Sequence, residues 1–194
     1  MVKRKAQLVV SDTEEETSSL IKRYKNIVYF HADVSKETVL KLAICLEKAS
    51  RHVLRFPSSK PDDQWVYLYV HSDGGDAYAG LSAMAHIKSS RVPVHTIVDG
   101  FVASAATFMI LAGKRRTMQL HARFLVHQIR MGFSGKYEDL LDEVENSNDL
   151  TKSILDIYKS VGGITTRHLN GIMKRERHLT ANECKELNFI HEIV

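Results

Sequence analysis

Residues 65–72, WVYLYVHS, constrain the fold more than any other stretch, because nearly all of them are apolar. A strand with one face in water alternates apolar and polar residues, whereas a strand covered by helices on both faces is apolar throughout. Two glycines at 74–75 end the run, and residues 77–90, AYAGLSAMAHIKSS, continue with the small residues of a closely packed helix. This stretch therefore predicts a parallel strand followed by its covering helix.

The same alternation recurs along the chain. Strands rich in β-branched and aromatic residues are predicted at 26–31, 93–100, 123–129 and 189–194. Helices are predicted after an N-cap at Ser35, after the turn at 100–107, over 137–161, up to about residue 174, and from a capping box formed by Thr180 and Glu183. The apolar stripe of the first helix comprises Val39, Leu40, Ala43, Ile44 and Leu46. Strands alternating with helices are typical of an α/β domain with a largely parallel sheet.

The chain of 194 residues is predicted to form one domain preceded by an arm. Residues 1–24 are polar and change from basic at 3–5 to acidic at 14–16, so we expect them to be a flexible arm. Residues 25–194 contain no repeat, low-complexity tract or linker, which indicates a single domain. The helical periodicity over 137–161 is too long for an ordinary surface helix.

Composition argues against several classes of protein. The chain is 44% apolar and 26% charged, as an ordinary globular domain is. No apolar run approaches the roughly 18 residues that span a membrane, so we expect no membrane association. The net charge of +4 is spread over clusters at 3–5, 114–116 and 174–177 without interleaved aromatic residues. We interpret these clusters as solvated faces or subunit contacts, and we expect no nucleic-acid binding.

Two cysteines, Cys45 and Cys184, are too few for a disulfide framework and lie in helix-like sequence. We expect them to be buried free thiols in a reducing compartment. The first residues are charged and lack the apolar core of a signal peptide. The expected location is therefore cytoplasmic.

Residues 100–107, GFVASAAT, place one hydroxyl among small residues where a strand gives way to a helix. There Ser104 would lie near the positive end of the helix dipole, beside backbone N–H groups without helical partners. Those are the conditions for a nucleophile with an oxyanion hole, and the alanines around Ser104 leave room for a substrate backbone. Taken alone, the stretch fits a helix cap or a small-residue packing position better than a nucleophile.

Three further positions could contribute to such a site. Gly75, in the SDGG turn at 72–75, permits a close approach of its N–H to a ligand oxygen, although a plain tight turn explains the glycines at least as well. His127 ends an apolar strand and precedes a flexible MGFSG segment, as a general base at the edge of a cleft would. Glu176 precedes the capped helix and by itself fits a solvated surface charge.

The sequence shows neither the residue spacing of a metal site nor a motif for nucleotide hydrolysis. Six histidines have no His, Cys or carboxylate partners at ligand spacing, namely His71, His86, His121, His168, His178 and His191. The chain contains no G-x-x-x-x-G-K-[ST] motif, so it does not hydrolyse ATP through a P-loop. We therefore expect neither a metal nor a cofactor.

Taken in order, four segments resemble the ClpP family of serine peptidases, the proteolytic subunits of the Clp protease. They are YLYVHSDGGDAYAGLSAM (67–84), GFVASAATFMILAG (100–113), RFLVHQIRMGFSG (123–135) and KRERHLTANECKELNFIHEIV (174–194). The resemblance runs from about residue 26 to the C-terminus. It implies an α/β, ClpP/crotonase-like superhelix of repeated β-β-α units, with a protruding handle helix at about 132–161.

By the same resemblance Ser104 is the nucleophile, His127 is the general base, and the backbone N–H groups of Gly75 and Ala105 form the oxyanion hole. Glu176 stands where the family has its catalytic aspartate, and its side chain reaches about 1.5 Å further, one C–C bond. The resemblance thus implies a serine endopeptidase with a Ser-His-Glu triad that is functional but weakened or switchable. Its substrates would be unfolded polypeptides.

The resemblance also implies partners. The chain would form heptameric rings, two of them stacked around a chamber, fed by an AAA+ unfoldase similar to ClpX or ClpA, which alone would use ATP. Tyr67 and Tyr69 match aromatic positions of the pocket that receives the unfoldase loops, although strand packing explains them equally well, and Thr117 replaces another aromatic of that pocket. Arg175 matches an arginine beside the catalytic acid and would link ring-to-ring contacts to order in the site.

Two departures from the family pattern are milder. Asp73 replaces the proline of the glycine turn and adds a charge near the expected cleft. Asn188 replaces a glycine near the C-terminus. Asparagine tolerates the left-handed conformation that glycine would adopt there, so we expect the loop to survive.

Two other functions stay open. The glutamate at 176 suggests a catalytically weak or silent ClpP-like ring subunit with a structural or regulatory role, although Ser104 and His127 are retained. A hydratase-like enzyme acting on acyl-CoA substrates shares the superfold and the paired glycines, but it needs no serine at the start of this helix.

Overall fold

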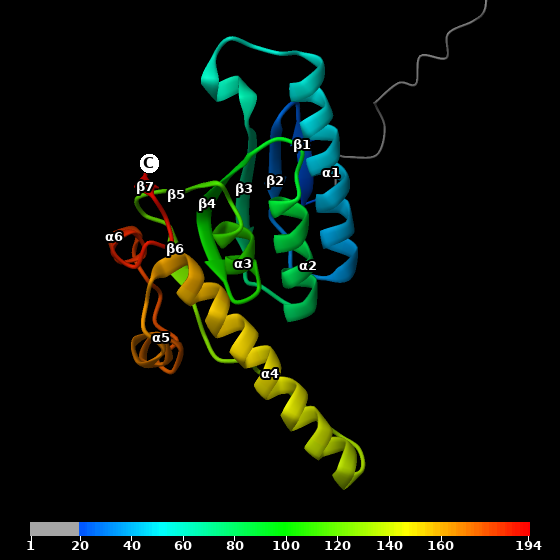
Figure 1. The fold of residues 1–194 in the computed structure, drawn as a ribbon, viewed down its shortest axis with the longest axis vertical. Coiled ribbons are helices and arrows are strands. Elements are labelled where there is room, and N and C mark those ends of the chain that lie inside the picture. The colour runs from blue at the N-terminus through cyan, green and yellow to red at the C-terminus, as the bar shows by residue number, and fades with distance from the viewer. Residues whose placement is uncertain (1–19) are drawn as a thin grey trace, which may run out of the picture.

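A seven-stranded sheet forms the centre of the computed structural model, which describes residues 20–194 (Figure 1). The strands are β1 (Ile21–Tyr24), β2 (Ile27–Phe30), β3 (Val66–Ser72), β4 (Val94–Ala103), β5 (Arg115–Met118), β6 (Arg123–Leu125) and β7 (Glu192–Ile193). Their order is β1-β2-β3-β4-β5-β7, and β6 pairs with β4. Every pairing is parallel except that of β1 with β2, so the predicted parallel α/β sheet is confirmed.

Six α-helices and one short 3₁₀ helix connect these strands within residues 20–194. They are α1 (Lys36–Arg55), the 3₁₀ helix η1 (Pro61–Gln64), α2 (Ala77–Lys88), α3 (Ala106–Leu111), α4 (Tyr137–Gly162), α5 (Thr166–Met173) and α6 (Ala181–Glu186). Ser35 caps α1, and Thr180 with Glu183 forms the capping box of α6, both as predicted. No helix in this part of the chain is long and apolar enough to cross a bilayer.

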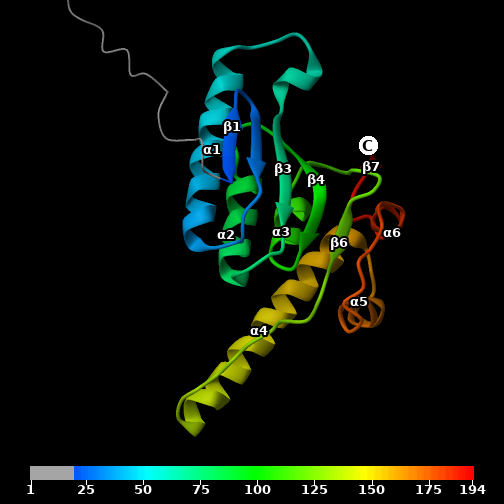
Figure 2. The same cartoon turned by 180° about the vertical axis from the view of Figure 1, so that it is seen from behind.

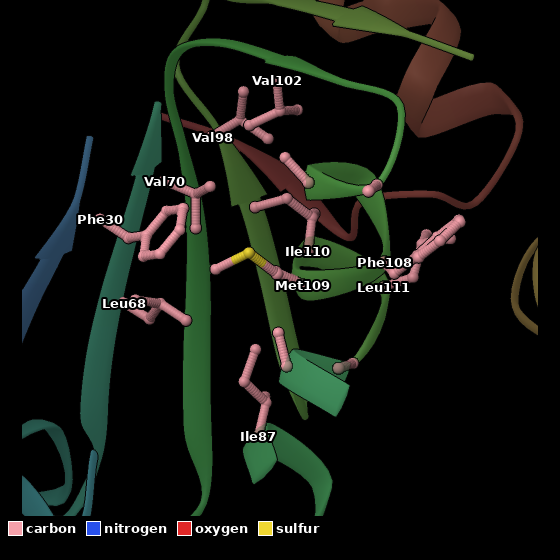
Figure 3. Close-up of a cluster of buried hydrophobic side chains, with 14 of the residues drawn as sticks. Phe30, Leu68, Val70, Ile87, Val98, Val102, Phe108, Met109, Ile110 and Leu111 are labelled. Carbon is pink, nitrogen blue, oxygen red and sulfur yellow. The ribbon is translucent and has the colours of Figure 1, made fainter. Parts of the chain in front are cut away.

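The core lies between the sheet and the helices that cover it. Figure 3 shows side chains of β2, β3 and β4 facing those of α2 and α3, among them Phe30, Leu68, Val98 and Met109, all fully buried. On β3 this packing buries Val66, Leu68 and Val70. The opposite face carries the half-buried Tyr67 and Tyr69 and the exposed His71, so the prediction that helices cover both faces of this strand is wrong. The stripe predicted for α1 is wrong in part, because Leu40 and Ile44 are exposed, and the buried face carries Val39, Leu42, Cys45, Leu46, Ala49 and Val53.

Helix α4 projects away from the rest of the molecule (Figures 1 and 2). Only Ile154 and Tyr158, near its C-terminal end, are buried. The outer half exposes four large apolar side chains, Tyr137, Leu140, Leu141 and Val144. The helix ends at Gly163, whose φ of 64° is a left-handed C-cap. The predicted protruding helix is therefore present.

Two boundaries predicted from the sequence need correction, and one strand was not predicted at all. Residues 21–24, assigned to the flexible arm, form β1 and pair with β2, and Ile21 is buried; residues 1–19 lie outside the described part. The strand predicted at 123–129 ends at Leu125, and β5 was not predicted. The sequence of β5, RRTM, is short and half basic, so it carries little strand signal.

Arg116 shows why the basic cluster at 114–116 is not simply a solvated face. Its side chain is only 9% exposed. Its guanidinium donates hydrogen bonds to the backbone oxygens of Gly113, Asn188 and Phe189, at 3.5, 3.2 and 3.0 Å. These bonds tie the C-terminal segment to β5.

We expect Arg116→Met to destabilise the protein, because it leaves buried carbonyl groups without a donor. A lost buried partner of this kind costs about 2–3 kcal/mol, which corresponds to a fall of roughly 5–10 °C in melting temperature for a chain of this size. Differential scanning fluorimetry measures the shift. The control is Arg115→Met, which removes the adjacent, exposed partner of Glu192 and should shift the melting temperature much less. Equal shifts in the two variants would contradict this account.

Candidate active site

Ser104 lies on the turn between β4 and α3. Its φ is +54°, a left-handed conformation that is uncommon for a residue other than glycine. Such a conformation costs about 1–3 kcal/mol and persists only where the surroundings impose it. The Ser104 N–H donates to the Leu125 carbonyl at 3.0 Å, which fixes the turn to β6. The half-buried side chain thus sits at a defined point where the sheet edge meets a helix.

A second contact fixes the Ser104 turn through the Ser104 carbonyl oxygen. Thr107 Oγ1 donates to the Ser104 carbonyl oxygen, and its other hydrogen bond joins it to the Tyr158 hydroxyl of α4. Tyr158 is 1% exposed, and burial raises its pKa above the ordinary value, so the phenol stays protonated. No motif in the sequence points to Thr107 or Tyr158, because nothing local reveals that residues 51 positions apart share a hydrogen bond.

The glycine turn at 72–75 packs directly against Ser104. A Cβ on Gly74 would lie 2.6 Å from the Ser104 Cβ, and a Cβ on Gly75 would lie 2.3 Å from the Val34 carbonyl oxygen. Both glycines have positive φ, 98° and 142°, so both reasons for glycine apply. Among the described residues, the N–H groups of Gly75 and Ala105 donate no hydrogen bond. The two amides are therefore free to bind an oxygen atom of a ligand.

His127 reaches the same place through strand pairing. The parallel register of β4 and β6 sets Ala103 beside Leu125, so Ser104 and His127 follow neighbouring strands at one edge of the sheet. His127 is half-buried. Its Nδ1 atom is buried and has no hydrogen-bond partner within residues 20–194. Buried polar atoms in proteins nearly always have a hydrogen-bond partner. The unpaired Nδ1 therefore indicates that His127 lacks one of its hydrogen bonds in this arrangement.

Glu176 approaches from the C-terminal segment. An antiparallel bridge joins Phe124 to Leu179 and brings the segment that contains Glu176 alongside the one that contains His127, and Glu176 itself lies in a turn with a φ of +47°. The Glu176 carboxylate, however, accepts hydrogen bonds from Arg130 Nη2 at 2.9 and 2.7 Å. Arg130 is the main reason why the pKa of Glu176 is lowered, and the charge of His127 lowers it further. Glu176 is thus close enough to His127 to interact with it, but it is bound to Arg130.

One cleft of about 410 Å³ collects most of these groups. Its lining includes Gly75, Ser104, Ala105, His127 and Arg130, together with Asp73, Asp76, Ala77, Phe108, Gln128, Ile129, Ile154 and Tyr158. Glu176 lies beyond the lining, behind Arg130. Within the described chain no hydrogen bond joins Ser104, His127 and Glu176 to one another. The structure therefore brings four of the five predicted groups into one cleft and leaves the acid at its edge.

The other predicted contact residues line separate hollows. Tyr67 and Tyr69 line a hollow of about 560 Å³ on the outer face of β3, together with Thr117. Arg175 lines another, of about 480 Å³, whose other basic residues are Arg167, His168 and Arg177. Neither hollow includes a residue of the Ser104 cleft.

The milder sequence departures are accommodated. Asn188 adopts a φ of +55°, and its side-chain amide donates to the Val161 carbonyl at 2.9 Å, so asparagine replaces glycine in the left-handed position as expected. Asp73 lines the cleft. In residues 20–194 no three His, Cys, Asp or Glu side chains gather as a metal site requires.

Comparison with known proteins agrees with this geometry. The family model described as Clp protease matches residues 47–194, which include every site residue named above. The chain is 29% identical over 146 residues to the ATP-dependent Clp protease proteolytic subunit of Chlorella vulgaris, covering 73% of this chain and 71% of that protein. It is 30% identical over 144 residues to the protein of the same name from Mesostigma viride, with 73% and 63% covered. The corresponding Ostreococcus tauri protein is 28% identical over 140 residues, with 71% and 70% covered.

These matches bear on one of the two alternative functions. They argue against the hydratase-like function, because the matching family model and the three relatives carry the Clp protease name. The parallel sheet and the projecting α4 agree with the ClpP-type α/β fold. The chain therefore belongs to the Clp protease family of serine-type peptidases.

Proposed function

We propose that the chain is a serine endopeptidase that hydrolyses unfolded polypeptides, with Ser104 as nucleophile. The observation that carries this proposal is the left-handed turn at Ser104, which opens into a cleft shared with His127 and with two free backbone amides. A strained serine at a strand-to-helix turn, next to unpaired N–H groups, suits nucleophilic attack on a carbonyl.

The proposed mechanism is acyl transfer through an ester. As Ser104 Oγ attacks the peptide carbonyl carbon, His127 takes the Oγ proton, and the N–H groups of Gly75 and Ala105 stabilise the oxyanion. The tetrahedral intermediate collapses when His127 gives that proton to the departing amine, leaving an acyl ester on Ser104. Water then attacks the ester with His127 again acting as base, which releases the acid product and restores the serine. No step needs a metal or an organic cofactor.

Glu176 completes the proposed relay. A carboxylate that accepts a hydrogen bond from histidine Nδ1 fixes the tautomer and the ring orientation, and stabilises the imidazolium that forms during attack. The buried, unpaired Nδ1 of His127 supplies the donor for that bond. Because Arg130 occupies the carboxylate here, Glu176 must turn from Arg130 toward His127 in the catalytic arrangement.

We further propose that the chain works as an assembly of two stacked heptameric rings. The exposed apolar residues on the outer half of α4, and Leu40, Ile44 and Tyr78 on α1 and α2, are suited to burial between subunits. Arg175 would take part in contacts between rings. Tyr67 and Tyr69, in the hollow on β3, would receive a segment of an AAA+ unfoldase, which would supply substrate and use ATP. Both cysteines are buried thiols outside any disulfide within residues 20–194, which suits the proposed reducing, cytoplasmic setting.

We expect Glu176→Ala to lower kcat/KM for a fluorogenic peptide by at least about tenfold, because the imidazole loses its orienting carboxylate. Glu176→Asp retains a carboxylate and should keep a substantial part of the activity. Glu176→Gln keeps the size but not the charge and should behave like the alanine variant. All three are compared on oligomer isolated by size exclusion. Wild-type activity in Glu176→Ala would remove Glu176 from the mechanism.

A second candidate function is a catalytically silent ring subunit. The engagement of Glu176 by Arg130, instead of by His127, is the observation in its favour. Treatment of intact rings with a fluorophosphonate separates the two candidates. An adduct on Ser104 supports the peptidase, and the absence of any adduct supports the silent subunit.

A further inference from the structure

The Glu176 carboxylate binds Arg130 and makes no hydrogen bond to His127. One nitrogen, Arg130 Nη2, donates to both carboxylate oxygens, at 2.9 and 2.7 Å. Meanwhile His127 Nδ1, three residues earlier on the same loop, is buried and has no partner within residues 20–194. Of two donors on one loop, only the guanidinium is bound to the carboxylate in this arrangement.

None of the other charged or titratable groups of the cleft binds His127 Nδ1. The charged or titratable side chains of the cleft, other than His127 itself, are Asp73 and Asp76 from the turn before α2, Arg130 from the loop after β6, and Tyr158 from α4. Asp76 already accepts from the Ala79 N–H at 2.7 Å as the cap of α2. Tyr158 is bonded to Thr107. Asp73 lines the cleft from the glycine turn but makes no hydrogen bond to His127 Nδ1, which has no partner within residues 20–194.

We propose that Arg130 is a positioning residue, which sets the fraction of molecules whose Ser104–His127–Glu176 relay is complete by holding Glu176 away from His127. The inference rests on the proposed peptidase function. The Arg130–Glu176 pair is well suited to such a balance, because its side chains are 72% and 49% exposed, and an exposed ion pair gives a weak and reversible bias. Arg130 also lowers the pKa of Glu176, so the carboxylate that the pair holds is the ionised form.

Removing the guanidinium should therefore speed the reaction. We expect Arg130→Leu to raise kcat/KM about threefold to fivefold. The gain is limited to this range because an exposed ion pair stabilises the Arg130-bound position of Glu176 only weakly. Salt should produce part of the same increase in the wild-type protein, because it screens exposed charges. A carboxylate next to an imidazole favours the protonated ring. The acidic limb of the pH profile of kcat/KM should therefore move to higher pH in Arg130→Leu.

The test measures two rates from pH 5 to 9, on oligomer isolated by size exclusion. One is kcat/KM for a fluorogenic peptide, and the other is the second-order rate of fluorophosphonate labelling at Ser104. The variants are Arg130→Leu, Arg130→Lys, which keeps the charge and should resemble the wild type more closely, and Arg130→Leu in a Glu176→Gln background, which should show no gain. The matched control is Arg51→Leu, since Arg51 is 70% exposed and pairs with Glu47 at 2.8 Å outside the cleft.

The outcomes separate this inference from the function on which it rests. Faster reaction in Arg130→Leu, with the shifted acidic limb and no gain without Glu176, supports the inference. A reactive wild type with an equal or slower Arg130→Leu overturns the inference alone and indicates that Arg130 helps to position Glu176 productively. A gain that persists in the Glu176→Gln background also overturns it. Absence of turnover and of any Ser104 adduct in all variants overturns the proposed function as well.

Discussion

Ser104→Ala is expected to abolish peptide hydrolysis, with a loss in kcat of at least about 10³-fold. Without the hydroxyl no ester can form, and only the residual effect of the oxyanion hole and of substrate binding remains. The fold should survive, because alanine and serine differ by one atom and meet the same restriction at φ +54°. The turn keeps the hydrogen bonds of the residue 104 backbone to Leu125 and Thr107, which do not involve the replaced oxygen.

A fluorogenic peptide assay on size-fractionated oligomer measures this loss, and circular dichroism verifies the fold. Ser59→Ala is the control, since Ser59 is an exposed serine of the loop after α1 and lies outside the Ser104 cleft. The control should keep full activity. Turnover by Ser104→Ala at the wild-type rate would show that another group attacks the substrate.

Gly75→Ala is expected to lower kcat by at least about 100-fold, because loss of a single oxyanion-hole donor costs about 10²–10³. The added Cβ would lie 2.3 Å from the Val34 carbonyl oxygen, at a φ of +142° that residues with side chains avoid. Either the turn or Val34 must move, and the Gly75 N–H moves with the turn. The hydrogen bonds between this turn and Val34, at 2.7 and 2.8 Å, will be strained, so the melting temperature should fall too.

Gly132→Ala provides the control for Gly75→Ala. A Cβ at Gly132 has no other atom within 4 Å, so this substitution meets open space. Activity is measured well below the melting temperature of each variant, so that loss of the oxyanion donor is not confused with unfolding. A folded Gly75→Ala protein with wild-type kcat would exclude this amide from the oxyanion hole.

Local pattern predicted the elements whose residues carry a strong periodic or capping signal. The strand β3, the glycine break after it, and the caps at Ser35 and Thr180 are all observed, although only one face of β3 is fully buried. The α1 stripe failed where apolar residues were too dense to define one face, so that Leu40 and Ile44 were placed inside although they are exposed. Density of apolar residues is a signal for burial only if one helical face stays polar.

Long-range pairing accounts for what the sequence did not reveal. Strand β5 has little local signal and is defined by its partners β4 and β7. Arg116 looks like a surface charge in the sequence, but three backbone carbonyl groups surround it after folding.

The site, too, depends on contacts between residues that are distant in the sequence. Resemblance located Ser104, His127 and Glu176, but the pairing of β4 with β6 and the bridge between Phe124 and Leu179 explain why these distant segments lie side by side. The contact between Arg130 and Glu176 had no counterpart in any motif. Its two residues lie 46 positions apart, and arginine in a flexible loop has no local preference for a particular carboxylate.

The most direct measurement for the whole account is the site at which a fluorophosphonate attaches to the assembled wild-type protein. Such reagents bind covalently to a serine hydroxyl only where a base and an oxyanion hole activate it. Intact-mass measurement followed by peptide mapping should find one adduct per chain, on Ser104, and none in Ser104→Ala or after prior denaturation. Intact rings that take up no label, or that take it up on another residue, would contradict the assignment of Ser104 as an activated nucleophile.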